Sequence, residues 1–148
     1  MTDQEFIDCF ESGSVPESGF HHMDHVRVAF AYLRKYAPLE ALLKFSKALK
    51  RFATSHGKTH LYNETITCAY FFLICERMAR HAAAIDWEEF ASLNPDLLTW
   101  KNGILTHYYK DATLKSELAR RTFILPDKPA SPLFDDRAVK YDGRAAIT

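Results

Sequence analysis

The sequence predicts an all-α protein, a single-domain helical bundle of about five to seven helices followed by an extended, proline-containing C-terminal segment. Three observations support this prediction. Apolar residues recur at spacings of three and four along several segments, as they do on one face of a helix. Patterns typical of helix caps precede several of these segments. No run of residues alternates between apolar and polar side chains over several strands, as a sheet would require.

The length and composition favour one domain with a substantial core. The chain has 148 residues, of which 47% are hydrophobic and 26% charged, which is typical of a globular protein. We assign residues 1–134 to the helical domain and residues 135–148, which have little apolar content, to a C-terminal tail.

Charge and cysteine content indicate the expected location and partners. The formal net charge is zero, so nucleic acid and membrane are not expected as partners. The three cysteines Cys9, Cys68 and Cys75 form no C-x-x-C pattern, which favours reduced thiols. The N-terminus lacks a basic, apolar signal sequence, and no apolar run approaches about 18 residues. We therefore expect a soluble, cytoplasmic protein.

The first three helices follow from caps and periodicity. Thr2-Asp3-Gln4-Glu5 is a capping-box pattern, and Gly13 is a plausible stop for the helix that it opens. A second helix is expected from His21 or His22 to Tyr36, before Pro38. The third is expected over residues 38–55, with one apolar stripe. The stripe consists of Leu42, Phe45, Leu49 and Phe52.

The remaining predicted elements are one long helix, several short helices or turns, and an extended segment. A fourth, strongly apolar helix is expected from about Leu61 to Ala83, although its β-branched start at residues 65–67 would also suit a strand. Short helices are expected after Asp86 and over residues 96–100. One or two further turns are expected over residues 104–109, a last helix over residues 112–121, and an extended segment containing Pro126, Pro129 and Pro132 that wraps over the bundle.

A cluster of histidines marks the first candidate site. His21, His22 and His25 lie within five residues, at the start of the second helix. His22 and His25 are three positions apart and share a helical face that continues through Ala29 and Leu33. Because that face is apolar, we expect both rings to point into the protein, whereas His21 lies off the face and is expected at the surface.

Glu64 is the predicted partner of these histidines. It shares a face of the fourth helix with Cys68, Phe71 and Cys75, so we expect it to point toward the core from the first turn. Thr67 lies on the same side, and His60 lies one turn earlier if the helix extends that far. In this interpretation His22 and His25 are catalytic acid/base or ligand groups, and Glu64 orients them or acts as a base.

Three interpretations of this cluster remain open. Four residues, His22, His25, His60 and Glu64, could contribute ligands to a divalent metal, although the H-E-x-x-H signature is absent. Alternatively, imidazoles, Glu64 and threonine hydroxyls could form a buried structural network. The third interpretation is a metal-free pocket that binds a small molecule. The identity of any cofactor is left open.

A second candidate site combines tyrosines with arginines. Tyr108, Tyr109 and Lys110, together with Arg120 and Arg121, could line a pocket for an anionic or aromatic ligand. Packing between helices combined with surface charge would explain the same residues.

Three blocks of sequence together resemble a known family. They are Phe20-His21-His22-Met23-Asp24-His25-Val26-Arg27-Val28-Ala29, Tyr62-Asn63-Glu64-Thr65-Ile66-Thr67, and Leu118-Ala119-Arg120-Arg121-Thr122-Phe123 with Pro126-Asp127. The set resembles a family of small uncharacterised, mostly bacterial proteins with the blocks F-x-H-x-x-H-V-R-x-A, Y-[HN]-E-T-I-T and A-R-x-x-F-x-x-P-D. The resemblance spans about residues 20 to 128.

The resemblance indicates which positions are functional, but it does not imply an activity. Asn63 stands where some members carry a histidine, and a neutral amide is a poor substitute for a metal-binding imidazole. The departure therefore favours a hydrogen-bonded pocket, in which Asn63 and Thr67 would contact the ligand. The positions implied to be functional are His22, Asp24, His25, Glu64, Thr65, Thr67, Arg120 and Asp127.

The leading hypothesis from the sequence is a small soluble protein with a buried His/Glu pocket that binds or transforms a small molecule, with Arg120 as the partner of an anionic group. The first alternative is a non-enzymatic interaction or scaffold protein with a structural His/Glu network. The further alternative is a divalent-metal-binding helical bundle. The sequence alone does not decide whether the protein is an enzyme or which oligomeric state it has.

Overall fold

The computed structural model describes residues 1–14, 19–81 and 84–129, and all regular structure in these ranges is helical. This confirms the predicted all-α class. The helices are α1 (Asp3–Glu11), α2 (His22–Lys35), α3 (Pro38–Ser55), α4 (Glu64–Ala79), α5 (Trp87–Leu93), α6 (Pro95–Leu98), α7 (Asp111–Leu114) and α8 (Glu117–Arg121). Two 3-10 turns, η2 (Thr59–Leu61) and η3 (Ile104–His107), complete the element order. The predicted tail, residues 135–148, and the positions of Ala83 and Pro132 lie outside the described residues.

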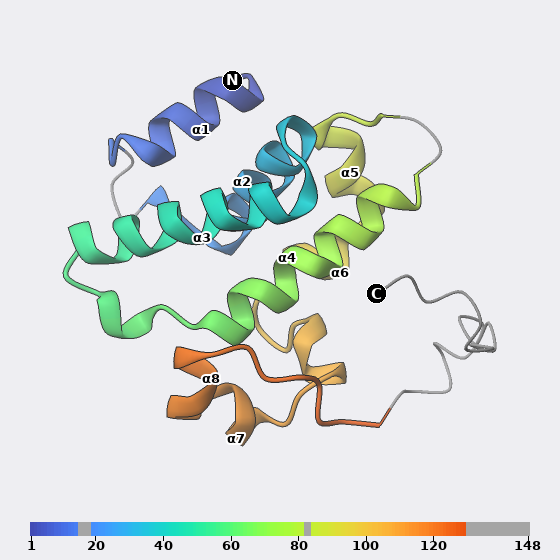
Figure 1. Ribbon diagram of the computed structural model, residues 1–148. Helices are drawn as coiled ribbons and strands as arrows, with labels where there is room; N and C mark the ends of the chain where they lie inside the picture. The colour runs from blue at the N-terminus through green and yellow to red at the C-terminus, as the bar shows by residue number, and fades with distance from the viewer. Residues whose placement is uncertain (15–18, 82–83, 130–148) are drawn as a thin grey trace.

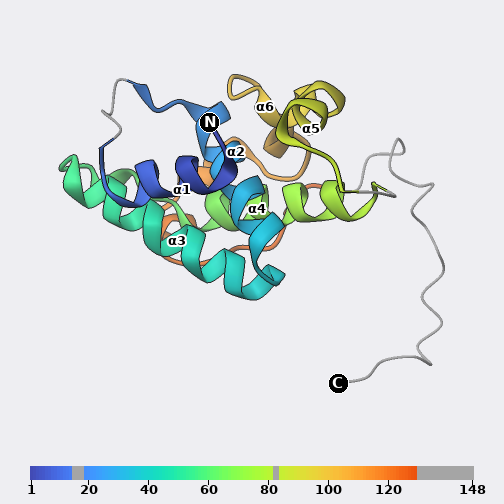
Figure 2. The same cartoon turned by 90° about the horizontal axis from the view of Figure 1, so that it is seen from above.

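Helix α2 lies at the centre of the bundle, in contact with α1, α3, α4 and α6. Figure 1 shows α3 and α4 crossing the middle of the molecule, with α7 and α8 on the far side of α4 from α3. Figure 2 shows α1 lying over α2 and α3, with which it is in contact. Helix α4 therefore connects two parts of the fold, because it also packs against α8 and η3.

The first three helices begin and end where the sequence predicts. The side chain of Thr2 accepts a hydrogen bond from the Glu5 amide, and the Glu5 carboxylate accepts one from the Thr2 amide, which completes the capping box. Pro38 occupies the first turn of α3, where its missing N–H costs nothing. Gly13 and Gly57 follow α1 and α3 with positive φ angles of 69° and 66°, which a side chain would disfavour.

Two later helices differ from the prediction. Helix α4 begins at Glu64 rather than Leu61, because the Asn63 side chain caps it by accepting a hydrogen bond from the Ile66 amide at 2.9 Å. The residues before it form the turn η2, so His60 does not continue the helix. The single helix predicted over residues 112–121 is two short helices, because the side chain of Ser116 caps a new helix by accepting from the Ala119 amide.

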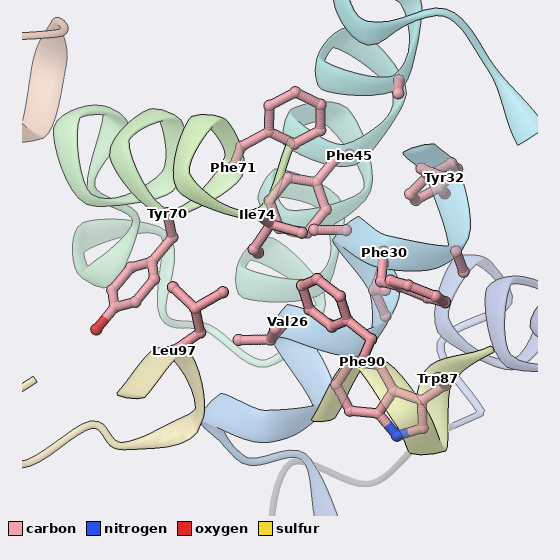
Figure 3. Packing of buried hydrophobic residues seen from close by; sticks show 14 of the residues in the cluster. Val26, Phe30, Tyr32, Phe45, Tyr70, Phe71, Ile74, Trp87, Phe90 and Leu97 are labelled. Carbon is pink, nitrogen blue, oxygen red and sulfur yellow. The ribbon is translucent and has the colours of Figure 1, made fainter. Parts of the chain in front are cut away.

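The core lies between α2, α3, α4 and α5 (Figure 3). Phe30, Phe71 and Phe90 are fully buried, and Phe30 contacts Phe90 with ring centroids 5.0 Å apart. Figure 3 shows Tyr70 at the edge of this cluster, with its hydroxyl directed away from the apolar side chains. The three cysteines are free thiols. No helix in the described ranges is long and apolar enough to cross a membrane.

A single buried threonine fastens the extended C-terminal segment to α4. The Thr65 hydroxyl donates to the Thr122 carbonyl at 2.7 Å and accepts from the Ile124 amide at 3.0 Å. Further along, the amides of Asp127 and Lys128 both donate to the Tyr108 carbonyl at 3.1 Å. The extended segment that was predicted to wrap over the bundle is therefore present over residues 122–129.

We expect Thr65→Val to lower the free energy of unfolding by about 1–3 kcal/mol, since the substitution keeps the shape but leaves a buried carbonyl and amide unpaired. Urea denaturation measures the change. The matched control is Thr54→Val, because the exposed Thr54 hydroxyl meets only the Thr59 hydroxyl, at 3.3 Å. A Thr65→Val loss no larger than that of the control would contradict the fastening role.

Candidate functional site

A cavity with a volume of about 290 Å³ lies between α2, α3 and α4. Aromatic and aliphatic side chains make most of its wall, and polar groups interrupt the wall at a few points. The mouth includes Trp100, whose side chain is 60% exposed, and Leu61. The lining residues are Phe20, His22, His25, Val26, Phe45, Leu49, Phe52, Ala53, His56, Lys58, Leu61, Tyr62, Asn63, Ile66, Thr67, Tyr70, Ile74 and Trp100.

One face of α4 forms a wall of this cavity. The residues on that wall, including the cap, are Asn63, Ile66, Thr67, Tyr70 and Ile74. Their spacings of three and four residues are those of a single helical face. Glu64 follows Asn63 directly, so it is rotated by about 100° from this face. Helix geometry therefore directs Glu64 away from the cavity.

Glu64 interacts with residues other than the predicted histidines. Its carboxylate lies 3.5 Å from the Lys50 ammonium and accepts a hydrogen bond from the Tyr62 hydroxyl at 3.3 Å. The Cys68 thiol, one turn along α4, also donates to it at 3.6 Å. The structure thus brings His22 and His25 to one cavity and places Glu64 on a different side of α4.

His22 is held in one tautomer by a backbone carbonyl. Its Nε2 lies 2.8 Å from the oxygen of Leu97. Because a carbonyl oxygen only accepts, Nε2 carries the proton and the neutral ring keeps Nδ1 as an acceptor. Burial lowers the pKa of His22, and the bond to Leu97 partly offsets this effect. The ring also packs against Tyr70 and Trp100, with centroids 4.7 and 5.2 Å away.

His25 also lines the cavity, and its pKa is strongly perturbed. Burial, and secondly the neighbouring His22, lower the pKa of His25 to about 4, although Asp24 acts in the opposite direction. Its ring packs against Phe20 at a centroid distance of 4.6 Å. Within the described part of the chain, neither ring nitrogen has a hydrogen-bond partner. At neutral pH the site therefore contains an uncharged imidazole with an unused donor and an unused acceptor.

A third imidazole in the cavity, His56, was not predicted. Its Nδ1 lies 2.9 Å from the Phe52 carbonyl, so this nitrogen is the donor and Nε2 is left as an acceptor. The ring also stacks on Phe52, at 4.4 Å between centroids. The sequence does contain a signal for His56, because it lies four residues after Phe52 and so continues the apolar stripe of α3.

Two tyrosines and two α4 side chains complete the polar lining. Burial raises the pKa of Tyr70 to about 12, and the Tyr70 hydroxyl lies against Gly103, where an added Cβ would come within 2.8 Å of it. Tyr62 donates its hydroxyl to Glu64. The two predicted ligand-binding residues Asn63 and Thr67 do line the cavity. The Asn63 amide, however, is already engaged, because it donates to the Leu114 carbonyl at 2.9 Å and caps α4.

The second predicted site, around Tyr108, is not assembled as expected. The Arg120 guanidinium pairs with Glu117 at 2.8 Å and donates to the backbone carbonyl of the exposed His60. Tyr109 is buried, and its hydroxyl donates to the Ile124 carbonyl at 2.7 Å. Tyr108 and Tyr109 do border a smaller groove of about 160 Å³, but Arg120 is not among its lining residues. Arg120 and Tyr109 thus hold chain segments together.

The predicted metal-ligand set does not converge. Among the described residues, no group of three or more His, Cys, Asp or Glu side chains could hold a metal ion. The ligands do not converge because α4 begins at Glu64 rather than at Leu61. With Asn63 as the cap, His60 lies in the exposed turn η2 and Glu64 faces Lys50, so His22 and His25 lack a third ligand from these residues.

No protein-family model, curated protein or solved structure matches the chain. The resemblance of the three sequence blocks to a bacterial family stays a prediction. The description of the site therefore rests on its own geometry.

The depressed pKa of His25 predicts a dependence of stability on pH. Between the ordinary value of 6.5 and the native value of about 4, the unfolded chain binds a proton that the folded protein does not. Stability should therefore fall as the pH drops through this window, by roughly 3 kcal/mol for this group. Denaturation in urea at several pH values between 7 and 4 measures the effect.

The variant His25→Phe isolates this contribution, because it keeps an aromatic ring and removes the titration. We expect its stability to fall less with acid than that of the wild-type protein. His21→Gln is the matched control, since the His21 side chain is 75% exposed, and it should keep the wild-type dependence. Equal pH dependence in the wild-type protein and His25→Phe would contradict the assignment.

Proposed function

We propose that this protein binds a small, largely apolar molecule in the cavity between α2, α3 and α4. The observation that supports the proposal most is the combination of a mostly aromatic wall with the His25 imidazole, which has no hydrogen-bond partner among the described residues. Ligand sites in proteins commonly have this character, with apolar walls and a few convergent polar groups.

A packing defect is a poor explanation for such a cavity. Protein interiors rarely leave voids larger than a water molecule, and this cavity has a volume of about 290 Å³. A ligand in this space would gain apolar contacts with the wall and a hydrogen bond to His25 at once.

Binding fits the chemistry of the site better than acid/base catalysis. A general base is most effective when its pKa lies near the working pH. The pKa of His25, about 4, makes it a weak base at neutral pH, and the carboxylate of Glu64 is bound to Lys50 and Tyr62. The proposal therefore retains the small-molecule ligand and assigns no reaction.

The scaffold alternative receives less support. Its central feature was a network of histidines with Glu64, and Glu64 instead pairs across to α3 through Lys50. Our proposal keeps the cytoplasmic location and the absence of nucleic-acid and membrane partners that the composition suggests.

The two tryptophans of the chain provide a direct binding assay. Trp100 lies at the cavity mouth, whereas Trp87 is only 8% exposed and contacts Phe30 in the core. We expect uncharged molecules of one or two rings to shift the indole N–H signal of Trp100 in ¹H–¹⁵N NMR spectra and to leave that of Trp87 in place. Ala53→Leu, which adds bulk on the α3 wall, should weaken binding by at least about tenfold.

The matched control is Ala69→Leu, because Ala69 lies on the face of α4 that borders the smaller groove. It should retain wild-type binding. The proposal fails if no compound shifts the Trp100 signal at millimolar concentration, or if Ala53→Leu and Ala69→Leu bind equally well.

A further inference from the structure

The three imidazoles that line the cavity offer more free hydrogen-bond acceptors than donors. His22 and His56 each donate an N–H to a backbone carbonyl, of Leu97 and Phe52 respectively, so the second nitrogen of each ring can only accept when the ring is uncharged. His25 adds one acceptor and one donor, neither of them used within the described residues. A ligand that is complementary to these imidazoles must therefore supply donors.

The charges around the cavity disfavour a carboxylate ligand. No Asp or Glu lines it among the described residues, and Lys58 is its one charged lining residue there. Lys58 is exposed, and it already takes part in another interaction. A carboxylate placed beside His25 would lose its hydration among aromatic rings and gain only neutral partners, which is costly.

The volume limits the size of the ligand. A dry cavity of about 150 Å³ accommodates one benzene ring. The volume here is about 290 Å³, roughly twice as large, which suits two fused rings. The rings of Phe20, Phe52 and Tyr62 on the wall would stack against a flat molecule.

Resting on the proposed function, we propose that the cavity selects an uncharged molecule of about two fused rings that carries a hydroxyl or N–H group, and that a ring nitrogen of His25 accepts this hydrogen. The selectivity arises because a ligand without a hydrogen-bond donor incurs a free-energy cost in the cavity that a ligand with a donor does not. A molecule of the same shape without a donor fills the cavity equally well but leaves the nitrogen of His25 buried and unpaired.

Matched ligands test the inference. Indole and benzothiophene have nearly the same shape, and only indole has an N–H. We expect indole to bind the wild-type protein about 5- to 20-fold more tightly, as one hydrogen bond predicts. In the same titration 2-naphthol should bind at least about tenfold more tightly than 2-naphthoate at pH 7.5. Dissociation constants come from shifts of backbone amide signals in ¹H–¹⁵N NMR spectra.

The variant His25→Phe tests the acceptor. It should bring the affinities for indole and benzothiophene within about twofold of one another, whereas His21→Gln should preserve the wild-type preference. If His25→Phe does not fold, the wild-type comparison of the two ligands still tests the selectivity.

The possible results separate the inference from the function on which it rests. Equal wild-type affinities for indole and benzothiophene would overturn the inference and leave the proposed binding function standing. A preference for indole that persists in His25→Phe would overturn the role of His25, and 2-naphthoate binding as tightly as 2-naphthol would overturn the selection for uncharged molecules. If none of the four compounds binds, both the inference and the proposed function fail for ligands of this size.

Discussion

Helix α4 has apolar side chains on nearly all of its faces, and the rest of the fold depends on covering them. A helix of this kind cannot leave one face to water and must be surrounded. Helices α2 and α3 cover one side, and α8 with residues 122–127 covers another, where Thr65 is fully buried. The face that begins at Asn63 is incompletely covered, and the cavity lies there.

The start of α2 explains why the imidazoles of His22 and His25 are neutral. His22 and His25 lie in its first turns, where burial lowers the pKa of both rings and His22 further disfavours protonation of His25. The partial positive charge at a helix N-terminus acts in the same direction. A histidine pair in such a place contributes hydrogen-bonding groups and stacking surface rather than charge, which is the character that a pocket for uncharged aromatic molecules needs.

The sequence predicts the local parts of this structure better than the relations between distant ones. The capping box at Thr2, the stripe on α3 and the inward face of His22 and His25 are local patterns, and each is present. The direction of Glu64 depends on which residue begins α4, and a shift of one position on a helix rotates a side chain by about 100°. The contacts of Arg120 with Glu117 and His60 required the turn at Ser116, which periodicity does not reveal.

The choice of residue at position 25 argues for a binding role. The ring of His25 packs against Phe20, and a phenylalanine would fill much the same space without a polar group that needs a partner. For stability alone, the imidazole is the worse side chain at neutral pH, since His25 is partly buried and its nitrogens have no hydrogen-bond partner among the described residues. Sites at which a protein retains such a cost are commonly those where function, not folding, determines the residue. A bound molecule with a donor group would recover this cost in the complex, so the feature that weakens the free protein would strengthen the bound one.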